Sequence, residues 1–214
     1  MKIRLFMVLA LALALGGCSN VYYGAMEKVG VHKRDIMVDR VKAARDTQTE
    51  TKQQFLTAME QFRSVVSFDG GNLEREYNKL NSSLQRSEAG ADEVRERIRA
   101  VEDVSDALFK EWRDELKQYS SATLRASSQR KYDITRARYA ELIASMKVAE
   151  RQLEPVLVPL RDKVLFLKHN LNAKAIAGLS GELVDVQVNV DKLVRDMDLA
   201  IAQADRFIAS LQNE

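Results

Sequence analysis

The sequence of 214 residues predicts an all-α protein, an elongated antiparallel helical bundle or coiled coil of about four long helices. Three observations predict this fold class. Apolar residues recur every 3.5 positions over long stretches, a spacing that makes helices pack along a continuous seam. Proline and glycine are scarce, at 2 and 9 residues. Hydrophobic residues make up 46% and charged residues 30% of the chain, which is typical of long amphipathic helices.

The first seventeen residues are predicted to be a signal peptide that is removed. Lys2 and Arg4 precede an apolar run at positions 5–15, which spans about 16 Å as a helix and is too short to cross a bilayer. The following Leu15-Gly16-Gly17-Cys18 resembles the lipobox of bacterial lipoproteins. That resemblance implies cleavage after Gly17 and acylation of Cys18, detectable with palmitate, which gives firm membrane anchoring. An incidental cysteine behind an ordinary signal is the alternative.

After cleavage, residues 18–24 are expected to form a lipidated tether and residues 25–214 a single helical coiled-coil domain. By resemblance to the sorting signals of Gram-negative lipoproteins, Ser19 favours the outer membrane, so we expect lipid anchoring at its periplasmic face. Both charges of the signal peptide are basic, so its removal leaves 31 basic and 31 acidic residues. This neutral balance argues against a nucleic-acid partner.

Steps of four and three residues define an apolar seam in each of four segments, and each segment predicts one helix. The first seam comprises Met37, Val41, Ala44, Gln48, Thr51, Phe55, Ala58, Phe62 and Val65. The second comprises Leu73, Tyr77, Leu80, Leu84, Ser87, Ala91, Val94, Ile98, Val101, Ser105, Leu108, Trp112, Glu115 and Tyr119. The third comprises Tyr132, Thr135, Tyr139, Leu142, Met146, Ala149, Leu153, Val156 and Leu160. The fourth comprises Leu183, Val186, Val190, Leu193, Met197, Ile201, Ala204, Ile208 and Leu211.

Polar residues interrupt the first seam at Gln48 and Thr51. Such side chains can fix the register of packed helices at some cost in stability, although a locally hydrated or loosely packed stretch is the simpler interpretation. Trp112 lies on the second seam, which favours core packing over a role in ligand binding. The seams leave open whether the helices close within one chain or between two chains of a homo-oligomer.

Turns are predicted where glycine, asparagine and serine gather between the seams. Asp69-Gly70-Gly71-Asn72 supplies two glycines for a tight reversal and an asparagine that can cap the second helix. The serine-rich residues 120–128 are the expected second turn, with its position open between 119 and 131. Gly178 is expected to close the third helix and Ser180 to cap the fourth.

Pro155 and Pro159 interrupt the third helical pattern, so we expect a kink or a helix restart there. Beyond them, the run 164–174 begins with apolar residues on more than one face. One interpretation is a contact surface for a partner, with basic side chains nearby to meet phosphate or carboxylate groups. Those basic residues are Lys163, Lys168, His169 and Lys174. The simpler interpretation is a central helix buried by neighbours on two sides.

The sequence resembles a bacterial family catalogued as domain of unknown function 2959. The motifs that carry the resemblance are Phe68-Asp69-Gly70-Gly71, Leu108-Phe109-Lys110-Glu111-Trp112, Pro155-Val156-Leu157 and Val164 to Ala173. It covers nearly all of the mature chain. The resemblance implies a mostly helical bacterial lipoprotein with no established activity and no catalytic residues to carry over.

The sequence lacks the common motifs of phosphate-binding loops, dinucleotide-binding folds and zinc hydrolases. Its one cysteine, Cys18, is expected to be acylated, and its two histidines, His32 and His169, fall in no metal or nucleophile motif. We therefore expect no enzyme, no catalytic residue, no metal site and no cofactor.

Two classes of function remain. The first is a lipid-anchored periplasmic helical bundle with a structural or protein-interaction role in the cell envelope, whose partners are the membrane, through Cys18, and an envelope protein. The second is a bundle that binds lipid or a small apolar ligand in a cavity formed where the helices part around residues 164–171.

Overall fold

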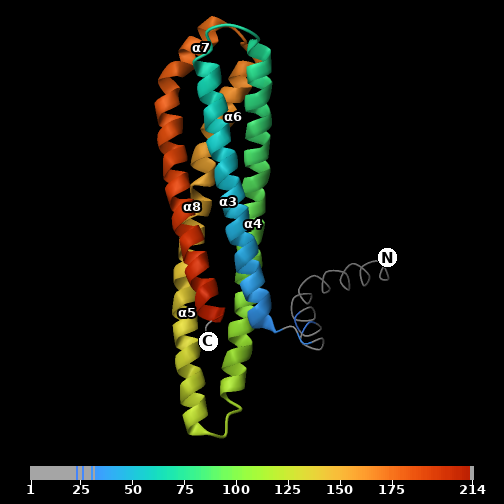
Figure 1. Cartoon of the computed structure of the whole chain (residues 1–214), viewed down its shortest axis with the longest axis vertical. Helices are drawn as coiled ribbons and strands as arrows, with labels where there is room; N and C mark the ends of the chain where they lie inside the picture. Colours follow the sequence, from blue (N-terminus) through green and yellow to red (C-terminus); the bar gives the residue numbers. More distant parts are fainter. Residues whose placement is uncertain (1–22, 24–25, 27–29, 31, 213–214) are drawn as a thin grey trace, which may run out of the picture.

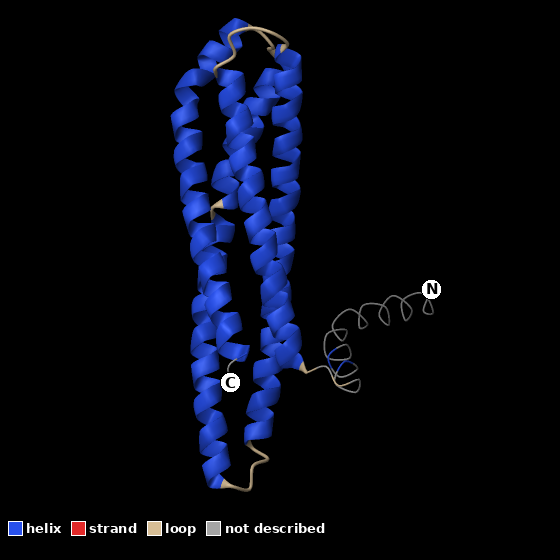
Figure 2. Cartoon of the chain, viewed as in Figure 1, coloured by secondary structure: helices blue, strands red, loops and turns tan. Residues whose placement is uncertain are grey.

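The computed structural model describes Tyr23, Met26, Gly30 and residues 32–212, and it forms an elongated bundle of four helical arms (Figure 1). The arms are α3 (Lys33–Val66), α4 (Leu73–Leu116), α5 (Ala122–Arg151) continued by α6 (Leu153–His169), and α8 (Leu183–Gln212). A short helix, α7 (Ala173–Leu179), and the 3-10 helix η2 (Ser180–Glu182) join α6 to α8. Figure 2 shows helices and connecting loops throughout the described part, with no strand, which confirms the all-α prediction.

The arms run up and down in turn and close into a ring. α3 packs against α4 and α8, and the arm made of α5 and α6 packs against the same two helices. At 34 and 44 residues, α3 and α4 are about 51 and 66 Å long at 1.5 Å per residue. This ring buries its apolar seams within a single chain.

The predicted seams form the core. All nine residues of the first seam are buried, and the second is buried from Leu80 to Leu108. The largest fully buried side chains include Phe55, Phe62, Leu80, Ile98, Leu142, Leu153, Leu167 and Leu193. These residues come from all four arms, so the 3.5-residue spacing identified the buried face of each arm correctly.

The first turn follows the prediction. Gly70 and Gly71 adopt positive φ angles of 154° and 109°, a region that residues with a Cβ rarely occupy. The side chain of Asn72 accepts a hydrogen bond of 2.9 Å from the backbone N–H of Arg75 and so caps α4. The two glycines and the asparagine therefore reverse the chain between α3 and α4.

The second turn lies at the beginning of the predicted stretch. α4 ends at Leu116, and the Ser121 side chain caps α5 by accepting a hydrogen bond from the N–H of Leu124. Ser127 and Ser128, expected in the turn, lie inside α5 instead. A single capping serine suffices to start the helix, and Ser128 instead accepts a hydrogen bond from the Trp112 indole.

The prediction for the third turn was wrong. α6 ends at His169, and Asn172 caps α7 by accepting a hydrogen bond from the N–H of Ala175. Gly178 lies within α7 and Ser180 begins η2, and neither Gly178 nor Gly181 has a positive φ. An asparagine side chain can cap a new helix, so the chain can reverse there without a glycine. The reversal therefore begins at Asn170, eight residues before Gly178.

The predicted restart at the prolines is confirmed. Gln152 separates α5 from α6, which places Pro155 in the first turn of α6, where its missing N–H has no helical partner to lose. Pro159 lies inside α6. The third arm is thus built from two helices.

The polar part of the first seam is closely packed at Thr51. A Cβ added to Gly90 of α4 would lie 2.8 Å from the Thr51 hydroxyl oxygen and 2.3 Å from the Gln54 side-chain oxygen. This contact rules out loose packing at Thr51, since only a glycine lets α4 approach α3 so closely. Gln48 is fully buried, and neither of its amide atoms has a hydrogen-bond partner in the described part of the chain.

Candidate interaction surfaces

Cys18, the predicted lipidation site, and the predicted signal peptide lie outside the described residues. Tyr23 is described and is buried in the main core, and Met26 packs against this core. Tyr23 lies five positions after Cys18, a span that can reach at most about 17 Å when extended. Tyr23, which falls within the predicted tether of residues 18–24, thus packs in the body of the bundle.

The predicted basic surface lies at the end of the bundle that carries α7, here called the α7 end. Lys168 and His169 are exposed in the last turn of α6, where positive charge is favoured by the helix dipole, and Lys174 is exposed in the first turn of α7. Lys163 differs, because its ammonium group pairs with Glu182 at 2.9 Å and its side chain is largely buried. Three of the four predicted residues are thus exposed at one end.

The last turns of α6 have one buried and one exposed apolar face. Val164 and Leu167 pack in the main core, whereas Leu165 is 57% and Phe166 45% exposed. Thus α4 and α8 pack against α6, as the simpler interpretation expected, but they leave the face of Leu165 and Phe166 exposed. Val158, seven residues before Leu165, is exposed on the same side of α6.

Exposed valines continue this apolar character on the neighbouring arm. Val184 and Val188, one turn apart near the beginning of α8, are both exposed at the α7 end. They are smaller than Leu165 and Phe166 but lie at the same end of the rod, since η2 leads directly into α8. The α7 end therefore combines exposed apolar side chains with three exposed basic ones.

A second surface, not predicted from the sequence, lies at the opposite end. There α4 and α5 extend past the first residue of α3 and the last residues of α8 (Figure 1). Lys33, which begins α3, pairs with Glu111 of α4 at 2.8 Å, and Leu211 near the end of α8 borders a hollow with Trp112. Of the helices that the structure describes, only α4 and α5 continue beyond this level. We call residues 110–138 the basic hairpin.

The basic hairpin has a small aromatic core of its own. Leu116 and Tyr132 are buried together with Phe109 at the base of the hairpin, and Tyr139 packs against both this cluster and the main core. The ring centroid of Tyr132 lies 5.7 Å from those of Phe109 and Trp112, in edge-to-face geometry. The Trp112 indole N–H donates a 2.9 Å hydrogen bond to the Ser128 hydroxyl. Trp112 therefore packs between two helices, as the seam predicted.

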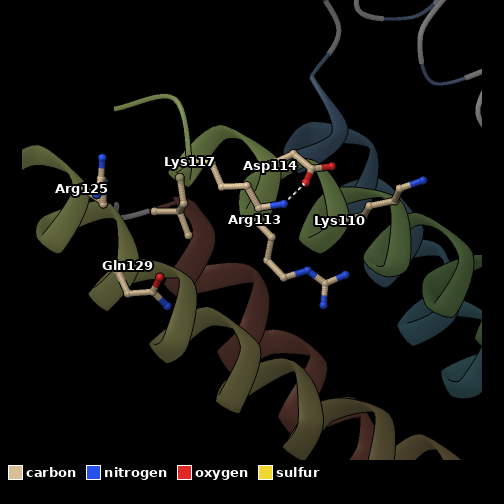
Figure 3. A pocket seen from close by; sticks show the side chains of 7 residues that line it. Lys110, Arg113, Asp114, Lys117, Arg125 and Gln129 are labelled. Carbon is tan, nitrogen blue, oxygen red and sulfur yellow. Dashed lines mark hydrogen bonds and ion pairs between the residues drawn. The ribbon is translucent and has the colours of Figure 1, made fainter. Parts of the chain in front are cut away.

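Basic side chains surround an open hollow of about 770 Å³ at this end (Figure 3). Its lining residues are Lys110, Arg113, Asp114, Leu116, Lys117, Arg125 and Gln129. The single carboxylate in this set, Asp114, pairs with Lys117 at 2.7 Å. The hydrogen bond from Lys117 lowers the pKa of Asp114, and the positive charges of Lys110 and Arg113 lower this pKa further. The hollow is thus positively charged.

The family model described as a protein of unknown function, DUF2959, matches residues 22–211. The chain belongs to this family. The match spans the described helices from α3 to α8 and confirms the resemblance drawn from the four sequence motifs. The comparison with curated proteins found no match.

Two of the four motifs of the DUF2959 resemblance lie at turns, and two lie within helices. One forms the turn after α3, one lies at the base of the basic hairpin, one begins α6, and the last runs from α6 into α7. Among the described residues, no group of His, Cys, Asp and Glu is arranged to hold a metal ion. None of the helices described is long and apolar enough to span a membrane.

Proposed function

We propose that this DUF2959 protein is a lipid-anchored helical rod of the periplasm, held at the outer membrane by acyl groups on Cys18, with a structural or protein-interaction role in the cell envelope. The observation that carries the interaction role is the exposed apolar face of α6 at the α7 end. Large apolar side chains gathered with charged residues are typical of protein interfaces.

The direction of the rod supports this role. The chain joins the packed body at Tyr23, five residues after Cys18, and α3 then runs for 34 residues towards the α7 end. Leu165 and Phe166 are therefore about 50 Å from the first residue of α3. An anchored rod of this length would present them well beyond the headgroup layer, where another envelope protein can reach them.

The anchor is tested by Cys18→Ala, with Ser19→Ala as the matched control. We expect Cys18→Ala to abolish palmitate labelling and to release the chain from the membrane fraction, because no other residue offers a thiol. The control should keep both properties. Continued labelling of Cys18→Ala would overturn the anchoring proposal.

The interaction role is tested by photo-crosslinking in intact cells from an amino acid introduced at Phe166, Lys168 or Lys174. The matched control is Leu199, which is exposed in the middle of α8. We expect one envelope protein to be captured from the α7 end and not from Leu199, and the double variant Leu165→Asp/Phe166→Asp to lose the capture while its thermal melting is unchanged. Equal capture from Leu199 would contradict a specific surface at the α7 end.

The lipid-binding alternative requires space between the helices around Val164. Val164 and Leu167 instead pack in the continuous main core with residues of the other arms. We therefore expect native mass spectrometry of the chain purified without its anchor to find no bound acyl species. A stoichiometric lipid would favour the alternative.

A further inference from the structure

The basic hairpin carries an excess of positive charge that the remainder of the mature chain does not have. Residues 110–138 hold eight basic and four acidic side chains, whereas the mature chain is formally neutral. The basic residues are Lys110, Arg113, Lys117, Arg125, Arg130, Lys131, Arg136 and Arg138. The remainder of the mature chain is therefore net negative, and the molecule is polarised along its length.

Much of this charge faces solvent. The first ten residues of α5, 122–131, contain no buried side chain, because α3 and α8 do not extend alongside them. Within the described chain, no carboxylate forms an ion pair with Arg113, Arg130 or Lys131. Leu124, in the first turn of α5, is 59% exposed. The tip thus presents cations around an exposed leucine.

The basic hairpin lies at the end where the chain enters the bundle. Lys33 at the beginning of α3 is level with Glu111, so α4 continues about 8 Å further, to Leu116, before the turn. An anchor at Cys18 would bring this end towards the membrane and would leave the α7 end remote. The positive tip would then lie on the membrane side of the rod, where its charge acts on headgroups that come within a Debye length of roughly 8 Å.

We infer that the basic hairpin binds the anionic phosphate headgroups of the membrane that holds the chain. The inference rests on the proposed function for its orientation, but the charge and exposure of the hairpin are independent of the anchor. Each Lys or Arg near an anionic surface strengthens partition about fivefold, and an exposed leucine at the tip enters the interface. The acyl chains and the basic hairpin then give the protein two contacts with the membrane. Two contacts restrict the angle between the rod and the membrane, whereas a lipid anchor alone leaves the rod free to rotate.

The test uses the complete processed chain with Leu124→Cys labelled by a polarity-sensitive fluorophore. Cys18 is the single native cysteine and is occupied by lipid in the proposed form, so the label has one site. A second chain carries the label at Val184→Cys, an exposed position at the α7 end. Both are added to phosphatidylcholine vesicles with and without phosphatidylglycerol.

We expect the emission of the label at position 124 to shift to the blue only with phosphatidylglycerol, and the label at 184 to remain unchanged. Arg113→Glu/Arg125→Glu should weaken the response at least 25-fold, whereas Lys168→Glu/Lys174→Glu, an equal change of charge at the α7 end, should preserve it. High salt should suppress the response. Unchanged melting of each double variant shows that the fold is retained, since all four side chains are exposed.

Three results would overturn the inference: no shift at position 124 with phosphatidylglycerol, the same shift with neutral vesicles, or an equal loss in the variant at the α7 end. A separate result shows whether the anchoring proposal fails. In that case the chain does not float with phosphatidylcholine vesicles, and co-sedimentation with phosphatidylglycerol vesicles, compared between the two double variants, still decides whether the hairpin binds headgroups.

Discussion

Replacing Gly90 by alanine tests how closely α3 and α4 pack. In an open helical position this change stabilises a protein by up to about 1 kcal/mol, because alanine has the higher helix propensity. At Gly90 the new Cβ would lie 2.3 Å from the Gln54 side-chain oxygen, 2.8 Å from the Thr51 hydroxyl oxygen and 3.1 Å from the Thr51 methyl carbon. Gln54 can move its flexible end away. Thr51 is buried and β-branched, so its rotation is restricted.

The expected magnitude follows from two opposing contributions. Overpacking a closed site costs about 1–3 kcal/mol, which offsets the gain in helix propensity. Gly90→Ala should therefore lower the free energy of unfolding by up to about 2 kcal/mol. The matched control is Gly178→Ala in α7, where no atom lies within 4 Å of an added Cβ. The control should raise the free energy of unfolding by up to about 1 kcal/mol.

Thermal and urea unfolding, followed by circular dichroism, measure both changes. For a chain of this size, about 1 kcal/mol corresponds to 2–4 °C in Tm. In a double-mutant cycle, Thr51→Ala should remove most of the cost of Gly90→Ala, since it deletes both contacting atoms of Thr51. An increase in Tm for Gly90→Ala equal to that of the control would refute the close approach of α3 and α4.

Three further predictions concern the core and the first turn. Leu80→Asp and Ile98→Asp should each lower the free energy of unfolding by about 4 kcal/mol, because both bury a charge in the packed seam; unchanged melting in both would mean that the seam is misassigned. Gln48→Met should raise it by about 1 kcal/mol in urea titrations by removing an amide without partners, and destabilisation would instead reveal a bound water or other partner. Asn72→Ala should lower it by about 1 kcal/mol through loss of the cap of α4, whereas an unchanged urea midpoint would show that the cap contributes nothing.

The fold was largely predictable because its information is local and periodic. A seam such as Leu80 to Leu108 repeats one geometric relation many times, so single polar members, such as Ser87 and Ser105, do not hide it. The reversal after α6 was not predictable in the same way. Glycine is more typical of turns than asparagine, so Gly178 was chosen over Asn172. The helix nevertheless ends before Asn172, whose side chain caps α7, and this cap depends on a backbone geometry that residue spacing does not reveal.

The surfaces were less predictable than the core. The run around Val164 showed apolar residues on two faces, but only the packing of the arms decides that Val164 is buried and Phe166 exposed. The basic hairpin was missed because the charges of residues 18–214 balance overall. Its charge becomes a surface feature only once α3 and α8 are known to stop near Glu111, and helix lengths of that precision do not follow from a periodic pattern.

The separate aromatic core of the basic hairpin divides the molecule into regions of unequal cooperativity. Four arms share the main core, so opening any part of it disrupts packing throughout the ring. Residues 112–131 depend on one neighbouring helix and a handful of rings, so their amide hydrogens should exchange with solvent through local opening that leaves the remainder intact. The protein thus combines a rigid four-arm bundle with a more mobile basic hairpin. The hairpin can therefore adjust to an uneven surface without disturbing the packing at the α7 end.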